Sequence, residues 1–378
     1  MAPGQDNAVN TTVAGHQTAP HLIRLADGRV VTVWASHGQD GSSGTIVARA
    51  SDGFGGPGGA EAQVNTSTAG AQIQATGTAT TQGHWVAWTG WAADGDGYGI
   101  FAQRYGTDGT ALGGEFQVNA IAAGHQWTPT LTTLSSGQVL AAWASRNEDG
   151  DGWGIAARIF DADGTPATGG SIVNATTAGA QTAPAVAALN TGRSAIVWGA
   201  EGVDGSSSAV VLRLFDATGA PEGAEITVNT TTAGAQSAPA VATLADGSLV
   251  VAWESTAPGS NDTDVHLQRL SADGAKIGAE VTVNSTTADR QRDPAIAALD
   301  TGGFVVVWES FDQDGDGIGI YAQRYAANGS AEGGEFRVTE TTQGSQEDPS
   351  VIALSGGAFL LAWHGPGHDS DGDGIAQR

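Results

Sequence analysis

The chain is an internal repeat with a period of about 55 residues, and this periodicity restricts it to repeat architectures. In every unit one glutamine precedes a hydrophobic run, one tryptophan ends that run, and one arginine closes the next run. The tryptophans are Trp34, Trp88, Trp143, Trp198, Trp253, Trp308 and Trp363. The glutamines are Gln17, Gln72, Gln126, Gln181, Gln236, Gln291 and Gln346. Successive members stand 54 to 56 residues apart, so the register of the repeat is fixed.

Each unit is predicted to contain four strands. In the sixth unit, the segments 294–299, 304–310, 318–325 and 335–338 alternate apolar and polar residues, and Gly, Asp and Asn separate them. Four antiparallel strands, repeated seven times, predict a seven-bladed β-propeller. A linear β-solenoid is the competing architecture, but its coils are usually about half as long and need capping repeats.

The two ends of the chain are complementary, which favours the propeller. The chain opens with a lone fourth strand at 6–10 and finishes with a set of three strands that ends at Arg378. We therefore predict an all-β ring over 1–378, closed by the N-terminal strand, because closure removes exposed sheet edges. The predicted units, numbered 1 to 7 below, are 11–65, 66–119, 120–174, 175–229, 230–284, 285–339, and 340–378 with 1–10.

Composition excludes several classes of function. Gly accounts for 57 of 378 residues and charged residues for only 15%, which suits short strands and tight turns. The net charge is −25 and Lys276 is the only lysine, so binding to nucleic acid or insertion into an anionic membrane is not expected. The absence of cysteine excludes disulfides and thiolate metal sites. No signal peptide is evident, so we expect any export signal to be encoded outside this segment.

Acidic loops between the second and third strands predict calcium sites. Asp312, Asp314 and Asp316 alternate with other residues, and this spacing opens the calcium loop of helix–loop–helix proteins. Gln323 stands where that loop has its closing Glu, so the surrounding fold differs. The alternative is that Asp-Gly pairs simply form hairpin turns. The predicted ligands are Asp312, Asp314, Asp316, Asp369, Asp371, Asp373, Asn147, Asp149, Asp151, Asp94 and Asp96.

The repeated residues are interpreted as structural. The seven tryptophans, and Trp85 inside a strand, are predicted to lie in the core. In every unit except the third, where Gly170 stands, an acidic residue lies four positions before the repeated Asn of the fourth strand, or before Thr339 in its place, and a cross-strand ion pair with the repeated arginine is expected. These acids are Asp6, Glu61, Glu115, Glu225, Glu280 and Glu335.

Aromatic residues outside the repeat positions indicate a ligand surface. Trp91 and Trp153 belong to the acidic loops, Trp127 to a connection between units, and Tyr98 lies near them. All should lie on the face that carries the acidic loops. Flat rings stack on the apolar faces of sugars, so carbohydrate binding is one interpretation. Packing over blade ends or at an interface is the other.

Catalytic motifs are sparse. The eight histidines are scattered, and neither an H-E-x-x-H nor a G-x-S-x-G context occurs. A sialidase-like propeller would need several convergent arginines, whereas seven of the fourteen arginines here belong to the repeat. We therefore expect a protein that is not an enzyme, with a hydrolase or lyase less favoured.

The repeat contains, in order, the elements Val-Asn, Gln, Pro, Trp-Glu-Ser, Asp-Gln-Asp-Gly-Asp-Gly and Ala-Gln-Arg-Tyr. It resembles repeats of large secreted bacterial proteins of the RTX-associated, adhesin-like kind. Its acidic loops also resemble those of FG-GAP propellers, as in integrin heads. The resemblance covers the whole chain and implies an extracellular calcium-binding module at a bacterial cell surface. The RTX nonapeptide itself is absent, and unit 5 departs from the pattern at 258–261.

Two functions from different classes follow. One is a binding or adhesion module for a glycan or surface protein, which the aromatic excess in units 2 and 3 favours. The other is a self-assembling subunit of a surface layer, filament or particle, which the near-equivalence of the units favours.

Overall fold

The computed structural model is an all-β structure and describes residues 6–53, 58–91, 95–367 and 372–378. Within these ranges there is no α-helix; the only helical turn is the 3-10 helix η1 (Ser355–Gly357). The described residues therefore include no helix that is long and apolar enough to cross a membrane.

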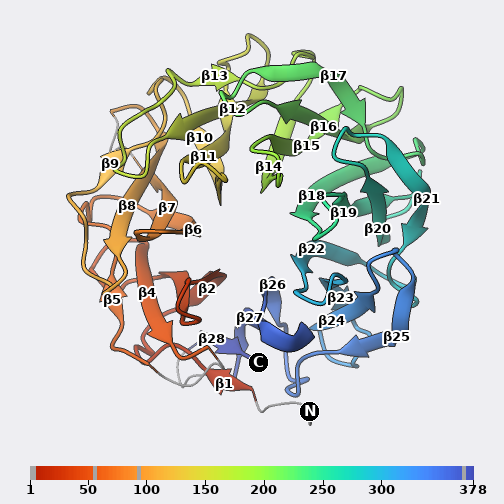
Figure 1. Ribbon diagram of the computed structural model, residues 1–378. Helices are drawn as coiled ribbons and strands as arrows, with labels where there is room; N and C mark the ends of the chain where they lie inside the picture. The colour runs from red at the N-terminus through yellow and green to blue at the C-terminus, as the bar shows by residue number, and fades with distance from the viewer. Residues whose placement is uncertain (1–5, 54–57, 92–94, 368–371) are drawn as a thin grey trace.

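The strands form four concentric series around a ring (Figure 1). The innermost series is β2 (Gln17–Arg24), β6 (Gln72–Thr80), β10 (Gln126–Thr133), β14 (Gln181–Ala188), β18 (Ala235–Thr243), β22 (Gln291–Ala298) and β26 (Glu347–Ala353). The second is β3 (Val30–Ser36), β7 (Gly83–Trp91), β11 (Val139–Arg146), β15 (Ser194–Glu201), β19 (Leu249–Thr256), β23 (Phe304–Phe311) and β27 (Phe359–Pro366). The third is β4 (Thr45–Ser51), β8 (Tyr98–Gly106), β12 (Trp153–Phe160), β16 (Ser208–Phe215), β20 (Thr263–Leu270), β24 (Ile318–Tyr325) and β28 (Asp373–Gln377). The outermost is β5 (Ala62–Gln63), β9 (Phe116–Gln117), β13 (Ser171–Ile172), β17 (Pro221–Thr227), β21 (Lys276–Thr282), β25 (Ala331–Arg337) and β1 (Asn7–Ala8).

These strands form five four-stranded sheets and one eight-stranded sheet. Strand neighbours within each set of four are antiparallel, and the eight-stranded sheet joins two such sets through one parallel pair, Ser208 with Ala235. The N-terminal β1 pairs with the C-terminal β28, with Asn7 opposite Gln377. The predicted all-β propeller and its closure by the N-terminal strand are therefore confirmed.

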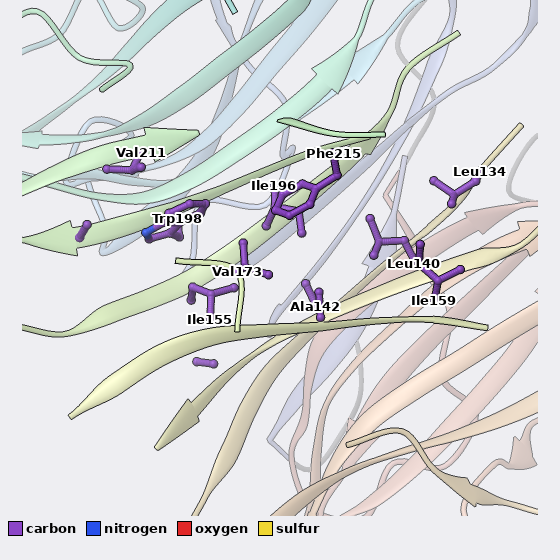
Figure 2. Close-up of a cluster of buried hydrophobic side chains, with 13 residues drawn as sticks. Leu134, Leu140, Ala142, Ile155, Ile159, Val173, Ile196, Trp198, Val211 and Phe215 are labelled. Carbon is purple, nitrogen blue, oxygen red and sulfur yellow. The ribbon is translucent and has the colours of Figure 1, made fainter. Parts of the chain in front are cut away.

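The hydrophobic core lies between neighbouring sets of strands. Figure 2 shows one such layer, in which Ile155 and Ile159 of β12 pack with Ile196 and Trp198 of β15. Trp198 is 1% exposed, and all seven repeated tryptophans and Trp85 are buried. The prediction that they form the core is confirmed, because alternate side chains of each second strand face the adjacent sheet.

The repeated Gln and Asn close the connections between units. Asn174 accepts a hydrogen bond from the Ile155 amide (2.8 Å) and donates to Gln181 Oε1 (3.0 Å). Gln181 in turn donates to the carbonyls of Ala178 and Gly179 at 3.1 and 3.0 Å. Buried backbone groups need such partners, so this network explains why both residues recur.

The predicted pairing of the repeated arginines with acids of the fourth strand is wrong in unit 1. Glu61 accepts hydrogen bonds from the Thr11 and Thr12 amides in the connection after β1. Arg49 instead donates to the carbonyls of Val9 and Gly59. The backbone amides of the neighbouring connection bind the Glu61 carboxylate in place of Arg49. This hydrogen bonding links adjacent sheets. At the ring closure the expected pair does form, with Arg378 Nη1 3.2 Å from Asp6 Oδ1.

A bulge interrupts every innermost strand near its start. In β22 the pairing with β23 shifts between Arg292 and Ala295, and Asp293 within the bulge has a left-handed φ of 50°. Such a backbone costs free energy for residues other than glycine, and the surrounding sheet must hold it in place. The equivalent left-handed residues are Ala19, Gln74, Thr128, Ala183, Ala238, Asp293 and Asp348. The bulge residues leave the hydrogen-bond ladder and line the axis of the ring.

Candidate active site at the axial cavity

The bulges of all the innermost strands surround a cavity of about 530 Å³ on the ring axis. Its lining comes from β2, β6, β10, β14, β18, β22 and β26, which encircle the centre of the ring (Figure 1). This volume lies within the range of about 300 to 1,000 Å³ that is typical of ligand pockets.

Ionisable side chains gather on one side of this cavity. At the left-handed bulge position, units 6 and 7 have Asp293 and Asp348, where the other units have Ala, Gln or Thr. At the position after the repeated tryptophan, units 5, 6 and 7 have Glu254, Glu309 and His364, where the others have Ala, Thr or Gly. We name the resulting set the axial acid cluster; it consists of Glu254, Arg292, Asp293, Glu309, Glu347, Asp348 and His364.

Two glutamates, one of them fully buried, fix the backbone of the two cavity aspartates. Glu254 Oε1 accepts a hydrogen bond from the Asp293 amide at 2.9 Å. One unit further on, Glu309 Oε1 accepts from the Asp348 amide at 2.7 Å. The glutamate of one unit thus holds the bulge of the next, and both aspartates are presented to the cavity in the same way.

Arg292 is the cation of the cluster. Its Nε donates to Glu309 Oε2 at 2.7 Å and lies 3.3 Å from Asp293 Oδ2. Its guanidinium also stacks over the Phe311 ring, 4.8 Å from the centroid. This packing holds Arg292 between the buried glutamate and the cavity aspartate.

The environment raises the pKa of Asp293 toward neutral pH. Removal from water raises the pKa of Asp293 to about 6, repulsion from Glu254, Asp348 and Glu347 acts in the same direction, and Arg292 opposes it. The Asp293 side chain is nevertheless 45% exposed and lines the cavity. A carboxyl group that is both protonated and reachable can donate its proton to a ligand.

The neighbouring groups differ in accessibility. Asp348 is 47% exposed, and His364 Nδ1 lies 3.3 Å from its Oδ2. Glu309 is fully buried. Burial is the main cause that raises the pKa of Glu309 to about 8, and repulsion from Asp293 adds to it. The hydrogen bond from Arg292 acts in the opposite direction. Asp293 and Asp348 can therefore contact a ligand, whereas Glu309 acts through the groups it holds.

The predicted calcium loops form tight turns. Asp94, Asp369 and Asp371 lie outside the described residues. Asn147 and Asp312 open their loops with left-handed φ values of 62° and 53°, and each amide donates at 2.6 Å to a glycine carbonyl across the turn. The last carboxylate of each loop forms a hydrogen bond with the connection that leads into the next unit. In three loops this carboxylate accepts from a glycine amide: Asp96 from Gly124 (3.1 Å), Asp151 from Gly179 (3.3 Å) and Asp316 from Gly344 (3.2 Å). In the fourth loop Asp373 lies 3.0 Å from His16 Nδ1. Sequence reasoning missed this link between units.

The middle carboxylates distinguish unit 3 from unit 6. Asp149 Oδ2 accepts a hydrogen bond from Asn174 Nδ2 at 2.7 Å. In unit 6 Thr339 replaces that Asn, and Asp314 Oδ2 is buried without a hydrogen-bond partner. A buried carboxylate oxygen without a donor fits a cation. Among the described residues, no three or more His, Asp or Glu side chains are grouped as a metal site.

Three of the four predicted ligand aromatics lie together. Tyr98 contacts both Trp91 and Trp127, whereas Trp153 packs against the core between units 3 and 4. Sequence reasoning missed the axial acid cluster altogether. Its signal was available: positions 254 and 309, and 293 and 348, break the repeat in consecutive units.

No family model and no curated protein matches this chain. Solved structures do resemble it. A protein of unknown function from Dyadobacter fermentans has a TM-score of 0.54 and 13% identity, covering 100% of this chain and 98% of that one. An alpha-L-arabinanase from Penicillium chrysogenum, complexed with arabinobiose, has a TM-score of 0.53 and 14% identity, covering 85% and 98%. An alpha-L-arabinofuranosidase from Fusarium graminearum, bound to an iminosugar inhibitor, has a TM-score of 0.53 and 14% identity. The match covers 86% of this chain and 98% of that one.

At these identities the likeness shows the propeller fold alone. The expectation that this chain is not an enzyme is nevertheless contradicted, because proteins of this fold include enzymes, among them an arabinanase and an arabinofuranosidase. That expectation rested on missing linear motifs. A propeller assembles catalytic groups from several units around its axis, so no linear motif is needed.

Proposed function

We propose that this chain is a glycoside hydrolase that cleaves a neutral, arabinose-type oligosaccharide or polysaccharide at the axial cavity. Asp293 is the proton donor, and Asp348 is the second carboxylate. The observation that carries the proposal is the placement of these two accessible aspartates at equivalent bulges of adjacent units, on one cavity wall. The neighbouring arabinanase, which was solved with arabinobiose, supports the substrate class.

The chemistry needs two carboxyl groups in different protonation states. Asp293 gives its proton to the glycosidic oxygen as the bond to the anomeric carbon breaks. Asp348 stabilises the positive charge that develops on the sugar ring, and water adds hydroxide to the anomeric carbon and returns a proton to Asp293. The acidic surroundings favour that cationic transition state. Glu254 and Glu309 are positioning residues because they bind the aspartate amides.

We infer that the propeller has seven blades. The cavity is lined by seven innermost strands, one from each sequence unit. The eight-stranded sheet supports this count, because a single parallel residue pair joins its two sets of four strands. The secreted bacterial origin and self-assembly remain predictions from the sequence.

The direct test is the release of reducing sugar from arabinan, with xylan and starch as other neutral polymers. We expect release from arabinan, and NMR of the first product will show whether the anomeric configuration is retained or inverted. The hydrolase proposal would be overturned if none of these polymers is cleaved by protein that circular dichroism shows to be folded.

Activity is expected to fall as pH rises through about 6. The pKa of Asp293 is raised, so its protonated, donating form is present below that pH and is lost above it. Glu254→Gln removes a negative charge that raises this pKa, so the falling limb of kcat/KM should move to lower pH. The glutamine carbonyl can still accept from the Asp293 amide. A falling limb at the same pH in wild type and variant would contradict the assignment of Asp293 as the acid.

We further propose that the loop of unit 6 binds calcium through Asp312, Asp314 and Asp316, with Asp314 Oδ2 as the observation that supports it. A ligand that binds only the folded state stabilises it by RT ln(1 + [L]/Kd) and so raises the melting temperature. We expect calcium, compared with EDTA, to raise the melting temperature, and Asp314→Asn to reduce that rise. Asp149→Asn is the matched control, because Asp149 already has a donor. Equal calcium responses in wild type and Asp314→Asn would exclude this loop.

A further inference from the structure

A row of aromatic rings lies over units 2 and 3, beside the innermost strand β10. Trp91 at the end of β7 lies 4.7 Å, between ring centroids, from Tyr98 at the start of β8. Tyr98 lies 4.9 Å from Trp127 of β10, and both contacts are edge-to-face at 69°. Three separate segments therefore supply one continuous set of rings, which we name the aromatic track.

The inner end of the track adjoins the strand β10, which lines the cavity. Trp127 directly precedes Thr128, which occupies the left-handed bulge position and lines the axial cavity. The outer end is open, because Trp91 is 41% exposed. Tyr98, Trp127 and His125 are partly exposed along the row, and His125 lies 5.9 Å from the Tyr98 ring.

Glycines seat the rings of the track. A Cβ on Gly70 would lie 2.7 Å from Trp91 Cδ1, and one on Gly97 would lie 2.8 Å from His125 Nδ1. Both glycines also have left-handed φ values, near 75° and 80°. The rings therefore rest against backbone, which holds them in place before a ligand arrives, and this lowers the entropic cost of binding.

The track is particular to this side of the ring. In unit 6 the residue equivalent to Trp91 is Phe311, and its ring is covered by the guanidinium groups of Arg290 and Arg292 at 4.1 and 4.8 Å. Trp91 instead lies beside the His125 ring, 6.1 Å between centroids, and is still 41% exposed. No lysine or arginine belongs to the track, and the chain carries a net charge of −25, so a neutral ligand fits it better than an anionic one.

We propose that the aromatic track binds successive sugars of a neutral oligosaccharide whose reactive end occupies the axial cavity. The proposed hydrolase therefore acts on chains, and its affinity increases with chain length. The inference rests on the proposed function for the identity of the cavity ligand. The stacking surface itself rests only on the rings, because sugar C–H faces pack on exposed tryptophan.

The test is calorimetric titration of Asp293→Asn protein, which keeps the track but lacks the proton donor, with arabinose oligomers from dimer to hexamer. Xylose and glucose oligomers serve as pyranose probes. We expect the hexamer to bind about tenfold more tightly than the dimer. In the same background, Trp91→Ala should reduce hexamer affinity about tenfold and leave the dimer unchanged, as expected for the loss of one stacking contact.

Trp91→Phe keeps an aromatic ring and should restore most of the hexamer affinity. Ile121→Ala is the matched control, because Ile121 is also exposed (45%) but lies outside the track. Melting temperatures confirm that each variant is folded. Trp91-dependent binding without hydrolysis of arabinan would keep the track and overturn the proposed function. Hydrolysis with unchanged hexamer affinity in Trp91→Ala, or no binding of any oligomer, would overturn the track.

Discussion

Asp293→Asn is expected to lower kcat on arabinan by at least about 100-fold, the usual contribution of a general acid. Asparagine has nearly the same shape as aspartic acid but cannot donate a carboxyl proton. The backbone should stay in place, because the Asp293 amide still donates to Glu254 and the bulge is set by the sheet. The measurement is the initial rate of reducing-sugar release at pH 5, where wild-type Asp293 is largely protonated.

Two further variants make this result specific. Asp348→Asn should reduce kcat to a similar extent, since it removes the second carboxylate. Asp262→Asn should leave activity unchanged, because Asp262 is an exposed acid of unit 5 that does not line the axial cavity. A leaving group that needs no protonation, such as a nitrophenolate, should partly restore the rate of Asp293→Asn but not that of Asp348→Asn. Full activity in Asp293→Asn would remove this residue from the mechanism.

Trp308→Ala is expected to lower the free energy of unfolding by about 3 to 5 kcal/mol, the range for truncating a large buried aromatic side chain. Trp308 has no exposed surface and packs between the sheets of units 5 and 6. Its Nε1 also donates to Gln291 Oε1 at 3.3 Å, so the substitution removes a buried hydrogen bond as well as packing. Urea unfolding followed by circular dichroism measures the change.

The exposed Trp91 provides the comparison for Trp308. Trp91→Ala removes the same side chain from a surface position and should cost less than about 1 kcal/mol. Trp308→Phe should have an intermediate effect, because most of the apolar volume remains. A loss below about 1 kcal/mol for Trp308→Ala would show that the neighbouring sheets do not depend on the repeated tryptophan for their packing.

The repeat predicted most of the architecture because its signals are local or periodic. Alternation of apolar and polar residues specifies each strand, and recurrence of Trp308 and its counterparts specifies which faces pack together. The closure of the ring also followed from the sequence, since a lone strand at one end complements three at the other. The pairing of Asn7 with Gln377 confirms it.

The partners of charged side chains could not be predicted in this way. Glu61 was expected to meet Arg49 within one sheet, but it bonds the amides of Thr11 and Thr12. Adjacency of strands places the two side chains within reach of each other, but it does not reveal that unpaired backbone amides of another connection lie equally near. Such amides are strong donors, and a carboxylate satisfies two of them at once.

The sequence by itself determined the strands, the repeat, the closed ring and the buried tryptophans, because these depend on the alternation and recurrence of residue types along the chain. Only the tertiary structure decided the candidate site. Glu254 meets Asp293, and Glu309 meets Asp348, across 39 residues and a boundary between units. Closure of the ring then brings the bulges to one axis, where burial and mutual repulsion raise the pKa of Asp293. Proximity and desolvation are properties of the folded ring, and no stretch of the sequence contains them.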